Sequence, residues 1–154
     1  MKCEYDKLYI IDAGSGIGYS IIWIAKALED SDCKASIIDA IEINSKYSIK
    51  AVQILNQYKF KNVKINVIND DAIDYISKLK EDSIDIAFID IEKQLYMKAI
   101  ELLSRKVKTG GLILFHNAIK PPPPKTFLEK ARTPPWKSTV IIPTAAGILL
   151  SIKQ

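Results

Sequence analysis

The sequence predicts an α/β protein with a Rossmann-like, mostly parallel sheet of seven strands, a C-terminal antiparallel hairpin and helices on both faces. Three observations predict this fold. Short apolar runs alternate with segments of helical periodicity, a glycine-rich turn follows the first run, and a short turn separates the last two runs. A chain of 154 residues is long enough for one core, so we expect a single domain over residues 1–154.

The first half of the chain is expected to contain three strand–helix units. Their strands are predicted at residues 8–12, 35–40 and 64–68. The first helix follows the glycine turn and carries apolar residues at helical spacing, namely Ile17, Ile21, Ile24, Ala25 and Leu28. The second helix starts after a cap at Asn44 or Ser45 and carries Ile49, Val52, Leu55 and Asn56. A short third helix is predicted over residues 72–79.

The second half is expected to complete the parallel sheet and add a hairpin. Residues 84–89 are nearly all apolar, which predicts a central, buried strand. A helix over 94–107 is expected to stop at Thr109-Gly110-Gly111, before a strand at 112–115. The proline-rich segment 120–138 is expected to be a stiff connection, or alternatively a ligand for another domain, with a short helix over 126–131. The hairpin strands are predicted at residues 140–142 and 148–152.

The composition is typical of a soluble globular protein, with 48% hydrophobic and 26% charged residues. The net charge of +4 permits contact with nucleic acid without indicating it, since Arg105 and Arg132 are the only arginines. Cys3 and Cys33 form no C-x-x-C pair, which favours free thiols in a reducing compartment. No leader pattern or membrane-length apolar run is evident, so we expect a cytoplasmic protein. Frequent Ile, Lys and Glu suit a thermophile or a low-GC genome.

A G-x-G-x-G turn, formed by Gly14, Gly16 and Gly18, lies between the first strand and the first helix. Its glycines allow the backbone to approach a ligand closely, and the free N–H groups of the helix start favour an anionic group. The dinucleotide fingerprint G-x-G-x-x-G would need a glycine at position 19, where Tyr19 stands. This spacing argues against a nicotinamide oxidoreductase and is typical of S-adenosylmethionine (SAM) methyltransferases.

Polar residues end each of the predicted parallel strands, where ligands of α/β sheets bind. These residues are Asp12, Glu42, Asp70-Asp71, Asp90 and His116-Asn117. Glu42 is expected to accept hydrogen bonds from both ribose hydroxyls, Asp71 to lie near the adenine amino group, and Ser20 to donate to the methionine carboxylate, although such acids are also ordinary helix caps. The residues expected to contact the cofactor are Asp12, Gly14, Ser15, Gly16, Gly18, Tyr19, Ser20, Glu42, Ile43, Asp71, Ala72 and Asp90.

The segment 88–96, Phe-Ile-Asp-Ile-Glu-Lys-Gln-Leu-Tyr, resembles the F-[IL]-D-x-x-K-x-x-Y motif of metal-dependent O-methyltransferases of the catechol and caffeoyl-CoA type. The glycine turn with its Tyr19-Ser20, the Gly110-Gly111 turn and the final hairpin are also similar to this family, so the resemblance covers residues 8–153. It implies a class I SAM-dependent methyltransferase fold and methyl transfer to a hydroxyl. A divalent cation would bind a vicinal diol, with Asp90 and Asn117 as ligands and Lys93 as general base.

Two departures from the family pattern affect this expectation. The family usually has Asp-Asn where this chain has His116-Asn117, which would weaken Mg²⁺ and favour Mn²⁺, Fe²⁺ or Zn²⁺; His116 is therefore either a ligand or a structural donor. Lys93 is either the base or an exposed lysine at a helix start. The family also usually carries an N-terminal helical cover, whereas the first strand here begins near Leu8, so a partner subunit or a homodimer could supply a lid.

Two further classes of function stay open at this point. An RNA methyltransferase of the same fold, acting on tRNA for example, would suit an open acceptor face and a positive net charge. A non-catalytic SAM-binding module would need a partner subunit for its function. Binding of SAM without turnover on any acceptor would identify the second class.

Overall fold

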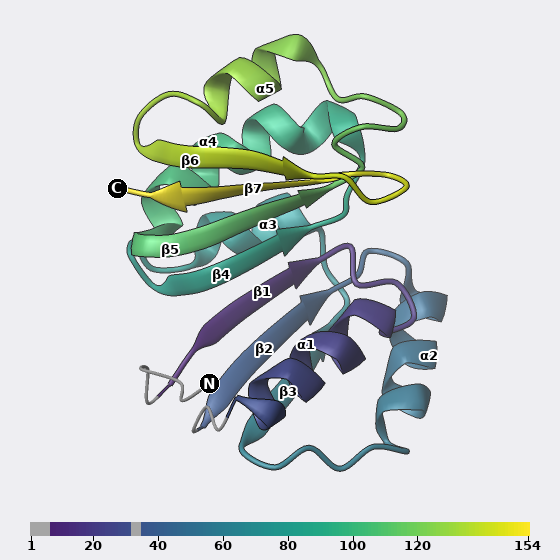
Figure 1. Cartoon of the computed structure of the whole chain (residues 1–154). Helices are drawn as coiled ribbons and strands as arrows, with labels where there is room; N and C mark the ends of the chain where they lie inside the picture. Colours follow the sequence, from purple (N-terminus) through teal and green to yellow (C-terminus); the bar gives the residue numbers. More distant parts are fainter. Residues whose placement is uncertain (1–6, 32–34) are drawn as a thin grey trace. The chain divides into compact units, whose positions relative to one another are not determined.

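The computed structural model describes residues 7–31 and 35–154, so Cys3, Cys33 and the predictions that concern them lie outside the described residues (Figure 1). The chain forms two compact units, Met1–Ala72 and Ile73–Gln154, and we describe each by itself. The prediction of a single domain over residues 1–154 stays a prediction. None of the helices in the described ranges is long and apolar enough to cross a membrane.

The first unit is a parallel three-stranded sheet with two helices. Its elements are β1 (Tyr9–Ala13), α1 (Tyr19–Asp30), β2 (Ser36–Ile41), α2 (Ser45–Leu55) and β3 (Val63–Ile68). The strand order is β3-β2-β1, with Ile11 beside Asp39 and Asp39 beside Asn66. The predicted strands are confirmed to within one or two residues at each end. Asn44 caps α2, because its side chain accepts a hydrogen bond from the Lys46 N–H at 3.0 Å.

The buried face of α2 differs from the predicted one. Ile49 and Val52 are 60% and 43% exposed, whereas the small residues Ser48 and Ala51 are buried. The reason is the close approach of the glycine turn, since a Cβ on Gly18 would lie 3.6 Å from the Ala51 Cβ. The turn at Gly18 therefore packs against the face of α2 that carries Ala51. Ile17 is also exposed, because it lies in the turn before α1 begins.

The second unit contains four strands and the remaining helices. Its elements are α3 (Ala72–Lys78), β4 (Ile84–Ile89), the 3₁₀ turn η1 (Lys93–Leu95), α4 (Tyr96–Lys106), β5 (Val107–His116), α5 (Lys125–Lys130), β6 (Trp136–Ile142) and β7 (Ile148–Lys153). The strand order is β4-β5-β7-β6, in which β4 and β5 are parallel and the contacts of β7 with β5 and β6 are antiparallel. This arrangement confirms the predicted C-terminal hairpin.

Two predicted boundaries in this unit are wrong. Residues 109–111 are not a turn before the fifth strand, because β5 already begins at Val107 and includes them. They form an irregularity in its pairing with β4, since Val107 lies beside Ile84 but Leu112 lies beside Ile86. Gly110 adopts a φ of 83° there. The connection 120–138 also ends earlier than expected, because β6 starts at the fully buried Trp136.

The two faces of this four-stranded sheet are covered differently. On one face, Tyr96, Phe115 and Phe127 form an aromatic cluster with ring centroids 4.7–5.2 Å apart, which joins α4, β5 and α5. Figure 1 shows α4 on the far side of these strands and no helix of this unit on the near side. The side chains that alternate with the buried ones are only half-buried, among them Ile86, Phe88, Leu112, Leu114 and Leu150. This unit therefore keeps an apolar sheet face without a helix of its own.

Candidate functional site

The glycine turn of the first unit is fixed by its own backbone hydrogen bonds. The N–H groups of Gly14 and Ser15 both donate to the Ile41 carbonyl, at 2.9 and 3.1 Å. Gly14, Gly16 and Gly18 all have positive φ angles, of 82°, 55° and 98°. Residues with a side chain rarely adopt a positive φ, which explains why the turn carries these three glycines.

Glu42 joins this turn to the start of α2. Its carboxylate is 7% exposed and accepts hydrogen bonds from the Gly16 N–H at 2.8 Å and the Asn44 N–H at 2.7 Å. Each carboxylate oxygen has a second lone pair, so Glu42 can still accept hydrogen bonds from a ligand. The sequence predicted Glu42 as a ligand acceptor but not its bond to the turn, because that bond depends on the backbone conformation at Gly16.

The residues beside the turn offer further polar atoms. Ser20 Oγ donates to Asp12 Oδ2 at 2.6 Å, so in this structure the Ser20 proton is directed to Asp12. Ser15 Oγ is buried and has no hydrogen-bond partner among the described residues. Because a buried hydroxyl normally finds a partner, Ser15 fits a site that receives a polar ligand atom.

The turn also leaves space for a ligand. No atom lies within 4 Å of the position that a Cβ on Gly16 would take, and α1 begins without a side-chain cap. Tyr19 and Ile43 flank the turn, with exposures of 73% and 69%. The Asp71 N–H donates to Asp70 Oδ1 at 2.8 Å, immediately before Ala72. The first unit thus places the predicted cofactor residues other than Asp90 at one end of its strands.

Asp90 and His116 form the centre of a polar cluster in the second unit. Asp90 Oδ2 lies 3.1 Å from His116 Nδ1, at the ends of the adjacent strands β4 and β5. His116 Nδ1 is buried and makes no aligned hydrogen bond with any described residue. Oxygen and nitrogen atoms that share one metal ion at bonds of about 2.1 Å stand about 3 Å apart when they are neighbouring ligands, so this pair fits a divalent cation.

Asn117 and Lys93 both contact the segment Lys120-Pro121, which follows the end of β5. Asn117 adopts a φ of 55°, and its side-chain nitrogen donates to the Lys120 carbonyl at 3.2 Å, which leaves the amide oxygen as an acceptor. Lys93 Nζ donates to the Pro121 carbonyl. Within residues 7–31 and 35–154, no three His, Cys, Asp or Glu side chains gather as a metal site. The donors available are therefore one carboxylate, one imidazole and one amide.

Tyr96 supports the cluster from α4. Its hydroxyl donates to the His116 carbonyl at 2.7 Å, and its ring is fully buried. Burial, and to a smaller extent the negative charge of Asp90, raises the pKa of Tyr96 well above its usual value of 10. Tyr96 thus fixes the end of β5 through its backbone, a role that the motif in the sequence did not specify.

Tyr96→Phe is expected to change how stability depends on pH. With the native tyrosine, the unfolded chain ionises Tyr96 near pH 10 while the folded chain keeps it neutral, so this residue destabilises the fold above that pH by up to about 1.4 kcal/mol per pH unit. The free energy of unfolding, measured with urea between pH 8 and about 11, should therefore fall less for Tyr96→Phe than for the native chain. Equal slopes in the two proteins would contradict the assigned burial of the Tyr96 hydroxyl.

These features define a Rossmann-like domain of the class that binds SAM at a glycine turn. Comparison with solved structures agrees: a methyltransferase from Geobacter sulfurreducens superimposes with a TM-score of 0.74 over 94% of this chain and 70% of its own, at 20% identity, which shows the fold. The sequence model of a family described as "Methyltransferase domain" matches residues 11–118. The chain therefore belongs to this family of methyltransferase domains.

Individual proteins with similar sequences include an O-methyltransferase and a tRNA methyltransferase. A candidate caffeoyl-CoA O-methyltransferase of Arabidopsis thaliana is 31% identical over 111 residues, which is 71% of this chain and 46% of the relative. A tRNA N(3)-methylcytidine methyltransferase of Schizosaccharomyces pombe is 31% identical over 125 residues, or 76% of this chain and 38% of the relative. The chain thus spans less than half the length of these relatives.

Proposed function

We propose that this chain transfers the methyl group of SAM to a hydroxyl acceptor with the assistance of a divalent cation. The observation that carries the proposal is the Asp90–His116 pair, whose facing oxygen and nitrogen atoms lie 3.1 Å apart without an aligned hydrogen bond. The similarity to a candidate caffeoyl-CoA O-methyltransferase supports a hydroxyl acceptor, and a vicinal diol is the acceptor that a cation would bind through both oxygens.

The first unit would bind the methyl donor. Gly16 leaves room for close approach, Glu42 would accept from the ribose hydroxyls, and Ser15 Oγ would bond a polar ligand atom. Asp12, Tyr19, Ile43, Asp71 and Ala72 would complete this contact surface. SAM supplies an electrophilic methyl group on a positively charged sulfur, so the acidic residues at these strand ends also suit its charge.

The second unit would hold the cation and move a proton. Asp90, His116 and the side-chain oxygen of Asn117 would be its protein ligands, and the cation supplies charge that stabilises an ionised hydroxyl. Lys93 would accept the hydroxyl proton at Nζ. Because Nζ donates to the Pro121 carbonyl in this structure, Lys93 would have to leave that carbonyl and enter the reaction as the neutral amine.

Asp90→Asn tests the cation part of the proposal. We expect Mn²⁺ affinity to fall at least tenfold, because the variant replaces a charged ligand with a neutral one, and methyl transfer to a catechol to fall with it. Titration calorimetry with Mn²⁺ and with SAM measures the two sites separately. Glu101→Gln on the exposed face of α4 is the matched control.

His116→Asp gives the converse test at the same cluster. The added carboxylate should shift the preference of the site from Mn²⁺ towards Mg²⁺, because Mg²⁺ favours oxygen ligands. Unchanged Mn²⁺ affinity in Asp90→Asn, together with unchanged metal preference in His116→Asp, would refute cation assistance. It would not bear on SAM binding, which is measured separately.

A further inference from the structure

The segment from the start of α2 to the end of β3 has an unusual charge pattern. Residues 43–69 contain no aspartate or glutamate and hold five lysines, Lys46, Lys50, Lys59, Lys61 and Lys64. All five side chains are exposed. This segment alone therefore carries more positive charge than the whole chain, whose net charge is +4.

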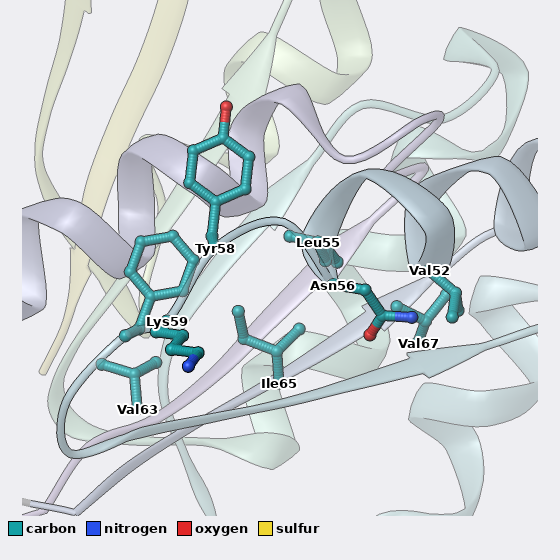
Figure 2. A pocket seen from close by; sticks show the side chains of 9 residues that line it. Val52, Leu55, Asn56, Tyr58, Lys59, Val63, Ile65 and Val67 are labelled. Carbon is teal, nitrogen blue, oxygen red and sulfur yellow. The ribbon is translucent and has the colours of Figure 1, made fainter.

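A cavity of about 410 Å³ lies within this same region. Apolar side chains line it from α2 and β3, including Leu55, Ile65 and Val67, as Figure 2 shows. Its volume falls in the range of about 300–1,000 Å³ that is usual for small-ligand pockets. Asn56 and Lys59 add polar atoms to the lining, and none of the residues predicted to contact SAM belongs to it.

Two aromatic rings lie at the edge of the cavity and alternate with lysines in the run Tyr58-Lys59-Phe60-Lys61. The rings of Tyr58 and Phe60 are stacked, with centroids 5.7 Å apart and planes inclined by 2°, and Tyr58 is 46% exposed. No hydrogen bond or ion pair engages Lys59 within the described part of the chain. Glu29 accepts a hydrogen bond from the Lys61 N–H at 2.8 Å, and its carboxylate also pairs with Lys26.

We propose that this surface binds single-stranded RNA, with one base in the cavity beside Tyr58 and the flanking phosphates on the lysines. The exposed ring of Tyr58 can stack with an unpaired base regardless of sequence, and lysines neutralise the backbone. A duplex keeps its bases paired and stacked, so it cannot place one of them in the cavity. The two features thus fit a flexible, unpaired strand, and this binding does not depend on the proposed O-methyl transfer.

Fluorescence anisotropy with a labelled oligouridylate of about 12 nucleotides tests the proposal. For three to five lysine contacts, log K against log salt concentration should have a slope of roughly −2 to −3.5. The same strand annealed to its complement should bind at least tenfold more weakly. Inorganic polyphosphate, which has charge without bases, should compete poorly.

Matched variants separate charge from stacking. Lys59→Glu combined with Lys61→Glu should weaken binding at least tenfold and flatten the salt dependence, while Lys98→Glu on the exposed face of α4 should have no effect. Tyr58→Ala should cost roughly tenfold, and Tyr58→Phe should restore binding because it keeps the ring. Calorimetry with SAM confirms that each variant is folded.

Three outcomes would overturn the proposal. RNA affinity within twofold of the native value in the double lysine variant would show that these lysines do not bind the RNA. An unaffected Tyr58→Ala, or polyphosphate that competes as well as RNA, would reduce the interaction to non-specific attraction of anions. Loss of RNA binding with intact SAM binding would leave the proposed methyl transfer untouched, so the two proposals fail separately.

Discussion

Glu42→Gln is expected to reduce SAM affinity by about 10- to 100-fold, which corresponds to the roughly 1.5–3 kcal/mol of a hydrogen bond to a charged group. The carboxylate accepts from the N–H groups of Gly16 and Asn44 at the same time. An amide has only one acceptor atom, and its NH₂ group would face one of these N–H donors. The substitution therefore disturbs the turn and removes a ribose acceptor together.

Titration calorimetry with SAM and with S-adenosylhomocysteine measures this effect. Glu101→Gln makes the same chemical change on an exposed helix face and should leave both affinities unchanged. Urea unfolding reports whether the turn itself is weakened. SAM affinity within twofold of the native value in Glu42→Gln would show that Glu42 has no role in the donor site.

Gly147→Ala is expected to destabilise the fold by about 3 kcal/mol or more, through positive φ combined with steric overlap. Gly147 has a φ of 77°, and an added Cβ would lie 2.8 Å from the Ile119 backbone nitrogen. The Gly147 carbonyl also accepts a hydrogen bond from the Ala118 N–H at 3.0 Å. The alanine would thus push away the loop that follows Asn117, so metal binding should weaken along with stability.

Gly110→Ala is the matched control for this effect. Gly110 has a similar φ of 83°, but no atom lies within 4 Å of the added Cβ. Only the cost of the backbone conformation remains, about 1 kcal/mol. Urea unfolding of both variants separates the two contributions, and equal destabilisation would mean that the contact with Ile119 is not tight.

The sequence predicted strands better than the packing of helices. Residues 84–89 were predicted to the residue, because a run that is apolar except for Asp85 lies between Ser83 and Asp90. The α2 face was wrong because apolar periodicity cannot detect that small residues such as Ala51 are buried against a glycine. The start of β5 was missed because glycines usually end a strand, whereas Gly111 is required here: a Cβ would lie 2.9 Å from the Asp85 carbonyl oxygen.

The candidate site was predictable to the extent that it depends on strand ends. Asp90 and His116 face each other because parallel neighbours β4 and β5 end at the same edge, which the order of the elements already implied. The contact of Ser20 with Asp12 was not predictable, since it depends on the rotation of α1 over β1. The acid-free segment 43–69 was visible in the sequence, but its cavity required the fold of α2 against β3.

The hydrogen bonds of the glycine turn have a consequence for the entropy of binding. The N–H groups of Gly14, Ser15 and Gly16 are bonded within the chain itself, to the Ile41 carbonyl and the Glu42 carboxylate. A loop that is ordered in advance loses little conformational freedom when a ligand arrives. The interaction free energy of this turn is then available for holding the ligand instead of being offset by the ordering of the backbone.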